Sequence, residues 1–201
     1  MAAQSIVEVN GARASEGPTG YALAARLVRG LAWIQLGAAG LLLVAATLVY
    51  GAEIVMRTFL NTSYPDYYEV VGFAFIYIFL FGAAALYALD EDIVIGMLHD
   101  LAPPRLRRWW VLAVYLLVAC TMALVLVYTV QLIGLQRNTP TPLLRVPEAI
   151  KWYPLAIASL SIIASSLLEA WGCVLWIASG VRPKTWPEPL LAQPPVEEAI
   201  I

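Results

Sequence analysis

Four long apolar stretches, separated by polar segments, dominate the sequence. No charged residue occurs in residues 30–52, 70–89 or 109–136, and the fourth stretch, 152–181, carries a single acid, Glu169. A helix rises about 1.5 Å per residue, so about 20 apolar residues cross a hydrocarbon core of about 30 Å. Because an isolated strand cannot satisfy its backbone in lipid, each stretch predicts a helix. The pattern predicts an all-α membrane protein with four transmembrane helices, at about 30–53, 69–89, 109–136 and 152–181.

The segment between the second and third stretches has the period of a short amphipathic helix. Apolar residues recur at helical spacing over residues 93–101, beside acidic residues and His99, and Pro103 and Pro104 end the pattern. The basic run 105–108 follows. We expect a short interfacial helix between helices two and three, with its apolar face among acyl chains and its basic end near anionic lipid.

The two chain ends show no comparable apolar period. Residues 1–29 are predicted to form a cytoplasmic N-terminal tail that leads into the four-helix transmembrane domain, residues 30–181. Residues 183–198 contain five prolines and three glutamates, a composition that does not sustain a helix. Residues 182–201 are therefore predicted to form a Pro-rich cytoplasmic tail.

Composition excludes several classes of protein. Hydrophobic residues make up 61% of the chain and charged residues 13%, against about 25% charged in soluble domains. This excludes a disordered protein and an ordinary soluble enzyme, and a net charge of −2 gives no field that would attract nucleic acid.

Charge distribution and tryptophans predict how the helices lie in the membrane. Lys and Arg are twice as frequent on the N-terminal segment, second loop and C-terminal tail together as on the first and third loops. The positive-inside rule then puts both termini in the cytoplasm. Trp109, Trp110 and Trp152 lie near the ends of the predicted helices, where indole rings prefer the headgroup zone.

The residues that could support chemistry are few. Ligation of a membrane haem by two imidazoles needs two histidines, and the chain has one, His99, in a loop. Cys120 and Cys173 fall inside predicted helices and are expected to pack as small apolar side chains. No nucleophile with a base, paired-histidine motif or glycine-rich phosphate loop occurs. We expect neither an enzyme nor a cofactor or metal site.

Three acidic residues lie in or beside the predicted helices. Glu53 and Arg57 have the i, i+4 spacing of a helical ion pair. Glu69 begins the second helix, where a carboxylate can cap the helix or contact another helix, or else bind a coupling ion. Glu169 lies well inside the fourth helix and is expected to face protein, paired or protonated, or else to carry protons in transport.

Small residues within the helices are candidates for helix packing. They include Gly37 and Gly40 in the first helix, residues 82–85 beginning with Gly82 in the second, and several serines in the fourth. Such residues form either a surface for a partner subunit or the interior of a self-contained bundle, and the sequence leaves both open.

The order of several short motifs resembles a known family. Residues 57–61 (RTFLN) end the first helix, Tyr68-Glu69 opens the second, and 79–85 (FLFGAAA) lies within it. A Thr-Pro-rich run follows the third helix at 139–142, and residues 152–154 (WYP) open the fourth. This order resembles the small membrane subunit, the DctQ type, of tripartite ATP-independent periplasmic (TRAP) transporters. The chain has Tyr68-Glu69 where the family has an acidic pair, and Asp-Ile-Val-Ile where it has a His-Ile-x-Val element.

The resemblance implies an accessory permease subunit in the bacterial inner membrane. Its partners would be a large membrane subunit, which carries an organic acid using the sodium gradient, a periplasmic binding protein and membrane lipids. The small subunit would act as a scaffold without a catalytic role. Arg57, Asn61 and Glu69 would hold helix ends, and Glu53, Gly82 and Glu169 are further structural or interface candidates. The outer loops would help to dock the binding protein, with Arg57, Arg137 and Arg145 as candidate contacts.

Two other functions remain open from the residues alone. The chain could anchor an enzyme complex in the membrane, or it could be a small homo-oligomeric exporter in which Glu169 is the proton-coupling carboxylate.

Overall fold

A computed structural model describes residues 19–62, 66–89 and 104–179. This part of the chain forms four α-helices and a short 3-10 helix, η1, namely α2 (Thr19–Leu60), α3 (Asp66–Ala88), α5 (Pro104–Gln136), η1 (Glu148–Trp152) and α6 (Tyr153–Ser179). All four α-helices are long and apolar enough to cross a membrane. The predicted all-α fold with four spans is therefore confirmed. The Pro-rich C-terminal tail, most of the N-terminal tail and the whole apolar period of the expected interfacial helix, 93–101 with His99, lie outside the described residues.

Helix α2 is much longer than the apolar stretch that predicts it. Its 42 residues extend over about 63 Å, roughly twice the thickness of a hydrocarbon core. The sequence places its start near residue 30, whereas the helix begins at Thr19. Residues 22–26 are strong helix formers, and the buried Tyr21 packs edge-on against Trp171 of α6, with ring centroids 5.8 Å apart. Hydropathy thus marks only the central part of α2, and packing extends it.

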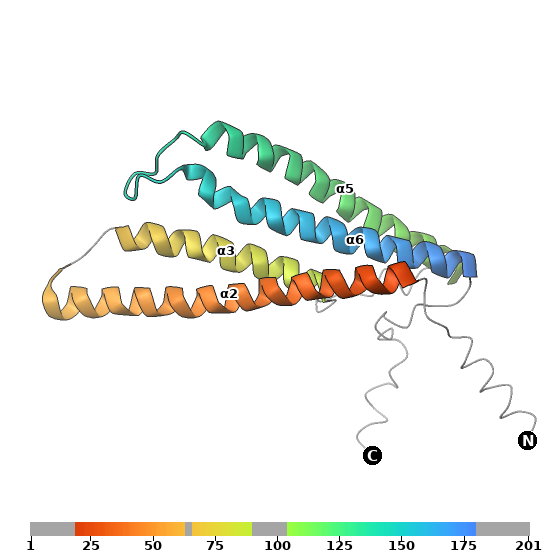
Figure 1. Cartoon of the computed structure of the whole chain (residues 1–201), viewed down its shortest axis with the longest axis horizontal. Coiled ribbons are helices and arrows are strands. Elements are labelled where there is room, and N and C mark those ends of the chain that lie inside the picture. The colour runs from red at the N-terminus through yellow and green to blue at the C-terminus, as the bar shows by residue number, and fades with distance from the viewer. Residues whose placement is uncertain (1–18, 63–65, 90–103, 180–201) are drawn as a thin grey trace, which may run out of the picture.

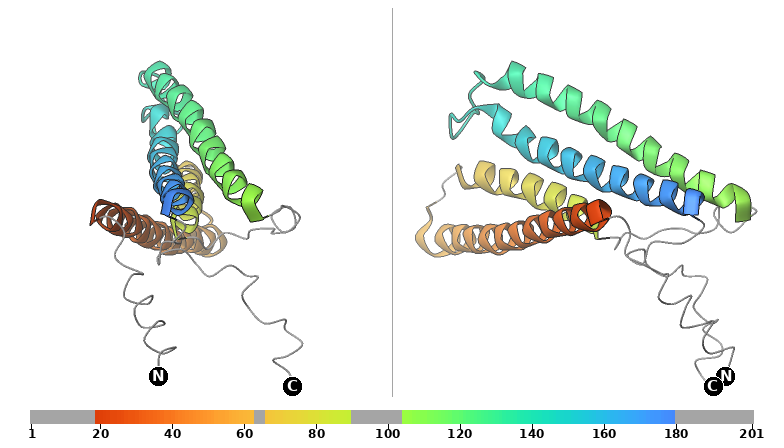
Figure 2. Two further views of the ribbon diagram at one scale, coloured as in Figure 1. Left: turned by 90° about the vertical axis from the view of Figure 1, so that its right-hand side faces the viewer. Right: turned by 45° about the vertical axis from the view of Figure 1, so that its right-hand side comes forward.

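The helices form two antiparallel hairpins, α2 with α3 and α5 with α6 (Figures 1 and 2). Helix α6 contacts the other three and is the best buried, whereas α5 packs mainly on α6. The start of α2 and the end of α6 lie at one end of the bundle, which we call the Tyr21 end. The α2–α3 connection and the loop before η1 lie at the opposite end, the Glu69 end, toward which α2 and α5 diverge (Figure 1).

A narrow seam of small residues packs α2 into the bundle. Every seventh residue of this seam is buried: three alanines, Ala32, Ala39 and Ala46, followed by Glu53. Gln35, between Ala32 and Ala39, is buried as well. A repeat of seven keeps one stripe of a helix facing its neighbour. Gly37 and Gly40, for which the sequence leaves open packing inside the bundle or a surface for a partner, are exposed. The alanines therefore mark the contacts of α2 within this chain, and the two glycines lie on the side of α2 that faces away from the bundle.

The serines of α6 form the polar interior of the bundle. Ser159, Ser161, Ser165 and Ser166 are all buried. Gln35 Nε2 of α2 donates a hydrogen bond to Ser161 Oγ at 2.7 Å. The hydroxyls of Tyr87, on α3, and Ser166 lie 2.8 Å apart. The expected packing of the serines therefore occurs within this chain, where they join α6 to α2 and α3.

Candidate functional site

The loop between α5 and η1, residues 137–147, has a defined hairpin-like shape at the Glu69 end. Pro140 and Pro147 form an isolated antiparallel bridge. The Thr141 amide donates to the carbonyl oxygen of Val146 at 2.8 Å, and the Val146 amide donates to Thr141 Oγ1 at 3.3 Å. Arg145, beside this pair, has a φ of 52°, a left-handed conformation that non-glycine residues adopt rarely. The loop is thus closed by hydrogen bonds across its base.

Glu69 holds this loop from the other hairpin. Its side chain, in the first turn of α3, presents Oε2 to the backbone amides of Leu143 at 3.1 Å and Leu144 at 2.9 Å. Hydrogen bonds to a carboxylate are charge-assisted and stronger than those between neutral groups. The sequence suggests capping or a contact with another helix for Glu69, whereas these bonds join it to the loop of the other hairpin.

A second side chain of α3 strengthens the same contact. The Tyr77 hydroxyl donates to the backbone carbonyl of Ile150, in η1, at 2.8 Å. Ala149, next to Ile150, is almost fully buried. Together, Glu69 and Tyr77 fix both the loop and η1 against α3.

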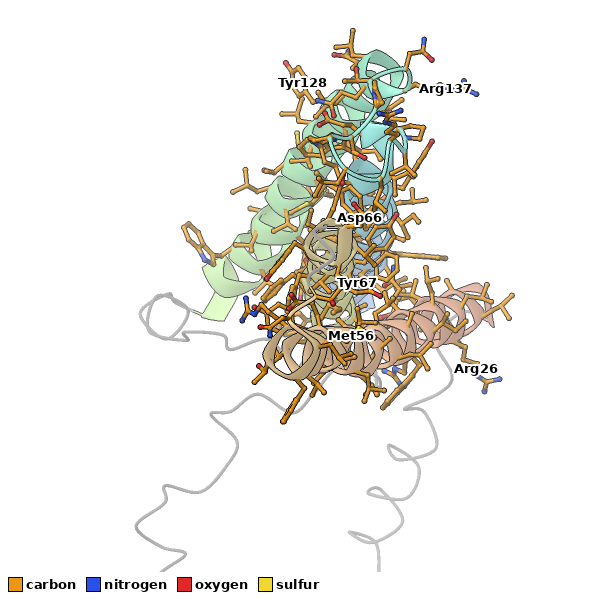
Figure 3. All side chains as sticks on the ribbon, turned by 90° about the vertical axis from the view of Figure 1, so that its left-hand side faces the viewer. Arg26, Met56, Asp66, Tyr67, Tyr128 and Arg137 are labelled. Carbon is orange, nitrogen blue, oxygen red and sulfur yellow. The ribbon has the colours of Figure 1, made fainter. Side chains whose placement is uncertain are left out.

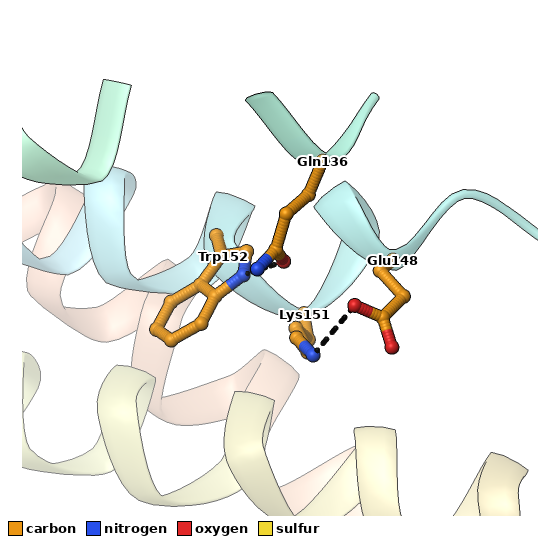
Figure 4. Close-up of polar contacts among 4 residues, drawn as sticks. All are labelled: Gln136, Glu148, Lys151 and Trp152. Carbon is orange, nitrogen blue, oxygen red and sulfur yellow. Dashed lines mark hydrogen bonds and ion pairs between the residues drawn. The ribbon is translucent and has the colours of Figure 1, made fainter. Parts of the chain in front are cut away.

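A third set of contacts closes the turn between α5 and α6 (Figure 4). Trp152 Nε1 donates to Gln136 Oε1, at the end of α5, at 2.6 Å. Lys151 Nζ lies 3.3 Å from Glu148 Oε2 and 5.6 Å from the centroid of the Trp152 ring. The indole N–H of Trp152, expected at the membrane interface, is thus satisfied by a protein group.

Glu53 and Arg57, expected to form a direct pair, are linked through Tyr68. The Tyr68 hydroxyl, at the start of α3, donates to Glu53 Oε1 at 3.3 Å and accepts a hydrogen bond from Arg57 Nη1 at 3.3 Å. The ring of Tyr68 also packs edge-on against Tyr50. Glu53 is 2% exposed and Arg57 is exposed. Tyr68 therefore connects a buried acid to a surface cation where α2 meets α3.

The docking candidates lie at different places on the Glu69 end. Arg57, Arg137 and Arg145 are all exposed. Figure 3 looks onto this end and shows Arg137 at the α5 side, far from Met56, the neighbour of Arg57 on α2. The three arginines therefore do not form one cluster.

Asn61, with a φ of 49°, directly follows the last residue of α2, a position where a left-handed residue often ends a helix.

Glu169 lines a small cavity near the Tyr21 end. The cavity has a volume of about 20 Å³, and Tyr21, Arg29, Tyr87 and Ser165 also line it. A space of this size can hold one water molecule. Glu169 thus faces protein and shares its cavity with a cation and two tyrosines.

The remaining candidates have different surroundings. Gly82 is half-buried, and a Cβ added there would meet nothing within 4 Å, so packing inside this chain does not require glycine. Trp109 and Trp110 are exposed near the start of α5. Cys173 is buried, whereas Cys120 is exposed. Within residues 19–62, 66–89 and 104–179, no three His, Cys, Asp or Glu side chains group as metal ligands.

Several contact residues were missed by sequence reasoning. Gln35, Tyr77 and Tyr87 each make a hydrogen bond between elements distant in the sequence. The available signal was a polar group inside a charge-free stretch, since such groups need a partner in lipid. Glutamine and tyrosine carry no formal charge, so they do not interrupt the charge-free stretches that mark the helices.

Comparison with known proteins assigns the chain to a family. The family model for tripartite ATP-independent periplasmic transporters, DctQ component, matches residues 46–175. The match runs from the last third of α2 to near the end of α6, and residues 19–45 of α2 lie outside it. No curated protein matches the chain. The chain therefore belongs to the DctQ family and is an inner-membrane small subunit of a TRAP transporter.

Proposed function

We propose that this subunit is a scaffold for the large membrane subunit of a sodium-coupled TRAP transporter for organic acids, and that its Glu69 end helps to dock the periplasmic binding protein. Family membership supports this function over the two alternatives, an anchor for an enzyme complex and a homo-oligomeric exporter, because it makes the chain a component of a tripartite transporter. The observation that carries the scaffold role is a second seam on α2.

This second seam, here called the outer seam, lies on the exposed side of α2. It consists of large residues at every seventh position, Ile34, Leu41, Leu48 and Val55, alternating with Gly37, Val44 and Gly51. The large residues are between 54% and 75% exposed. A Cβ added at either glycine would meet nothing within 4 Å.

The spacing of the outer seam favours a helix as its partner. Steps of three and four residues, repeated along α2, keep one stripe facing a second helix that crosses at a small angle. Glycine at two of the three intervening positions, Gly37 and Gly51, lets two backbones approach closely in a membrane. Acyl chains gain nothing from this spacing, and glycine costs a helix about 1 kcal/mol relative to alanine. The large membrane subunit is the membrane-embedded partner that the family supplies.

Co-purification with a matched pair of variants tests this role. The tagged chain is co-expressed with the large TRAP subunit from the same source, and the complex is purified in mild detergent and weighed. We expect a stable one-to-one complex whose recovery falls several-fold with Gly37→Leu. Gly134→Leu in α5 is the control, because Gly134 is also exposed with open space around it. Equal recovery of both variants, or a homo-oligomer without a partner, would contradict the scaffold role.

The braced loop supports the docking role. A loop already fixed by Glu69 and Tyr77 loses little conformational freedom on binding, which favours its use as a docking surface. Arg145 and Arg137 are exposed on this loop, and Arg57 is exposed on α2. Charged residues at the rim of an interface act mainly on the rate of association.

Uptake measured against the concentration of binding protein tests docking. We expect Arg137→Glu together with Arg145→Glu to raise the half-saturating concentration of binding protein several-fold. At saturating binding protein, uptake by this variant should match the wild type, which serves as the internal control. An unchanged half-saturating concentration would exclude these arginines from docking and leave the scaffold role standing.

A further inference from the structure

A hollow of about 420 Å³ lies on the surface of α2 near the Tyr21 end, in the part of the helix before residue 46 that the family match does not include. Within the part of the chain that the structure describes, its lining residues all belong to α2: Ala22, Ala25, Arg26, Arg29, Gly30 and Trp33. The alanines and Gly30 form a low floor, and a Cβ added at Gly30 would meet nothing within 4 Å. Longer side chains, two cationic and one aromatic, therefore enclose a shallow apolar surface.

The two cations of this hollow lie on one face of the helix. Arg26 and Arg29 are three residues apart, a spacing that places side chains side by side. Both are exposed, and Arg26 points away from the other helices (Figure 3). A guanidinium offers N–H groups in a fixed fork that matches two oxygens of a phosphate. Arg26 thus presents its donors to an anion that approaches from outside the bundle, and Arg29, which also borders the Glu169 cavity, adds its own beside them.

The position of the hollow places it at the depth of lipid headgroups. Arg29 is the last charged residue before the charge-free stretch, residues 30–52, which is about 35 Å long as a helix. This length covers a hydrocarbon core of about 30 Å, so Arg26 and Arg29 lie at its edge. Trp33, 61% exposed, lies one turn further into the membrane, where an indole ring contacts the glycerol region and the first acyl carbons.

We propose that this hollow binds an anionic phospholipid of the adjacent leaflet. Arg26 and Arg29 hold its phosphate, and an acyl chain lies over Gly30 and beside Trp33. The charges discriminate between lipids, because a zwitterionic headgroup carries its own cation next to the phosphate and gains less from the two arginines. The bound lipid covers the exposed face of α2 near the Tyr21 end, next to the first residues of the outer seam.

Lipid titration of the full-length chain tests the site. The chain in mild detergent is titrated with phosphatidylglycerol and, separately, with phosphatidylcholine, and bound lipid is counted by native mass spectrometry. A basic side chain near anionic lipid changes its binding about fivefold, so Arg26→Gln with Arg29→Gln should weaken phosphatidylglycerol binding about 25-fold. Phosphatidylcholine binding should change little.

A matched double variant provides the control. Arg57→Gln with Arg137→Gln removes the same charge from exposed positions at the Glu69 end. This control should retain the wild-type affinity for phosphatidylglycerol within about twofold, given the short range of such interactions. Unchanged affinity of the Arg26/Arg29 variant for phosphatidylglycerol, or an equal loss of affinity in the control, would overturn the proposal. A protein partner would then be the remaining occupant of the hollow.

Fluorescence quenching places the lipid at Trp33. The measurement uses vesicles that contain brominated phosphatidylglycerol. The difference in tryptophan emission between the wild type and Trp33→Phe gives the emission of Trp33 separately from that of the other six tryptophans. We expect stronger quenching of this emission by brominated phosphatidylglycerol than by brominated phosphatidylcholine, and no such difference after Arg26→Gln with Arg29→Gln. Equal quenching by both lipids in the wild type would also overturn the site.

Discussion

The middle of the bundle and its Glu69 end are held together in different ways. In the middle, small side chains let the helices approach, and single hydrogen bonds between side chains, such as Gln35 to Ser161, join them. At the Glu69 end, side chains of α3 bind backbone groups of another hairpin, as Glu69 does at Leu143 and Leu144. Shape positions the helices in the middle, and directed polar contacts position the loop at the end.

The membrane explains this difference. A transmembrane helix satisfies its own backbone, so contacts between helices need only close packing and an occasional polar pair. The loop 137–147 is not helical, and its amides need partners from elsewhere. A carboxylate that accepts two of them therefore gives this loop a fixed position relative to α3.

Enlarging a residue in the buried seam of α2 should have the largest effect on stability. Ala39→Leu adds a side chain where Ala39 is buried, and overpacking of this kind costs about 1–3 kcal/mol. The measurement is the free energy of unfolding of the purified chain in mixed micelles. Ala45→Leu is the control, because Ala45 is exposed on the same helix. Equal effects at both positions would mean that shape does not organise the middle of the bundle.

Removing the Glu69 carboxylate should have the next largest effect. Glu69→Ala leaves the Leu143 and Leu144 amides without their charged acceptor, and we expect it to destabilise the chain less than Ala39→Leu, because water partly replaces the carboxylate. Limited proteolysis should then cut residues 137–147 faster, while the packing of α2 stays intact. Asp66→Ala, in the same first turn of α3, is the control. Unchanged proteolysis of the loop would show that it holds its shape without Glu69.

Replacing Gln35 should cost less, although Gln35 is more deeply buried. Gln35→Leu keeps most of the volume and removes the bond to Ser161, and hydrogen bonds between membrane helices contribute about 0.6 kcal/mol on average. A double-mutant cycle with Ser161→Ala isolates this term. A coupling energy above about 2 kcal/mol between Gln35 and Ser161 would show that hydrogen bonding, rather than close packing, mainly stabilises the middle of the bundle.

The smallest effect is expected at the Lys151–Glu148 pair. Both side chains are partly solvent-exposed, and such pairs contribute about 0–1 kcal/mol. Lys151→Gln should lower the free energy of unfolding by less than about 0.5 kcal/mol, measured as for Ala39→Leu. A larger loss would indicate that Lys151 also supports Trp152 through its ring contact, and repeating the substitution in Trp152→Leu would separate the two contributions.

Single residues show how far the sequence leads into the site. Glu69 is recognisable as a residue with a structural role because it opens an apolar helix, yet its partners, two amides more than 70 positions away, are not. Glu53 and Arg57 are recognisable as a pair by spacing, but Tyr68 enters from another helix. Local spacing identifies neighbours on one helix, and it carries no information about which helix lies alongside.

The sequence by itself determined the four membrane spans, the helical class and the order of motifs that indicates the DctQ family. These follow from hydropathy and local spacing, because lipid allows a long apolar stretch few structures besides a helix. Tertiary structure alone decided that α2 begins at Thr19, that its alanines rather than Gly37 and Gly40 face the bundle, and that Glu69 holds the loop of the other hairpin. The physical reason is that hydrophobicity does not distinguish a helix face in lipid from one in protein, so only packing between distant segments makes the choice.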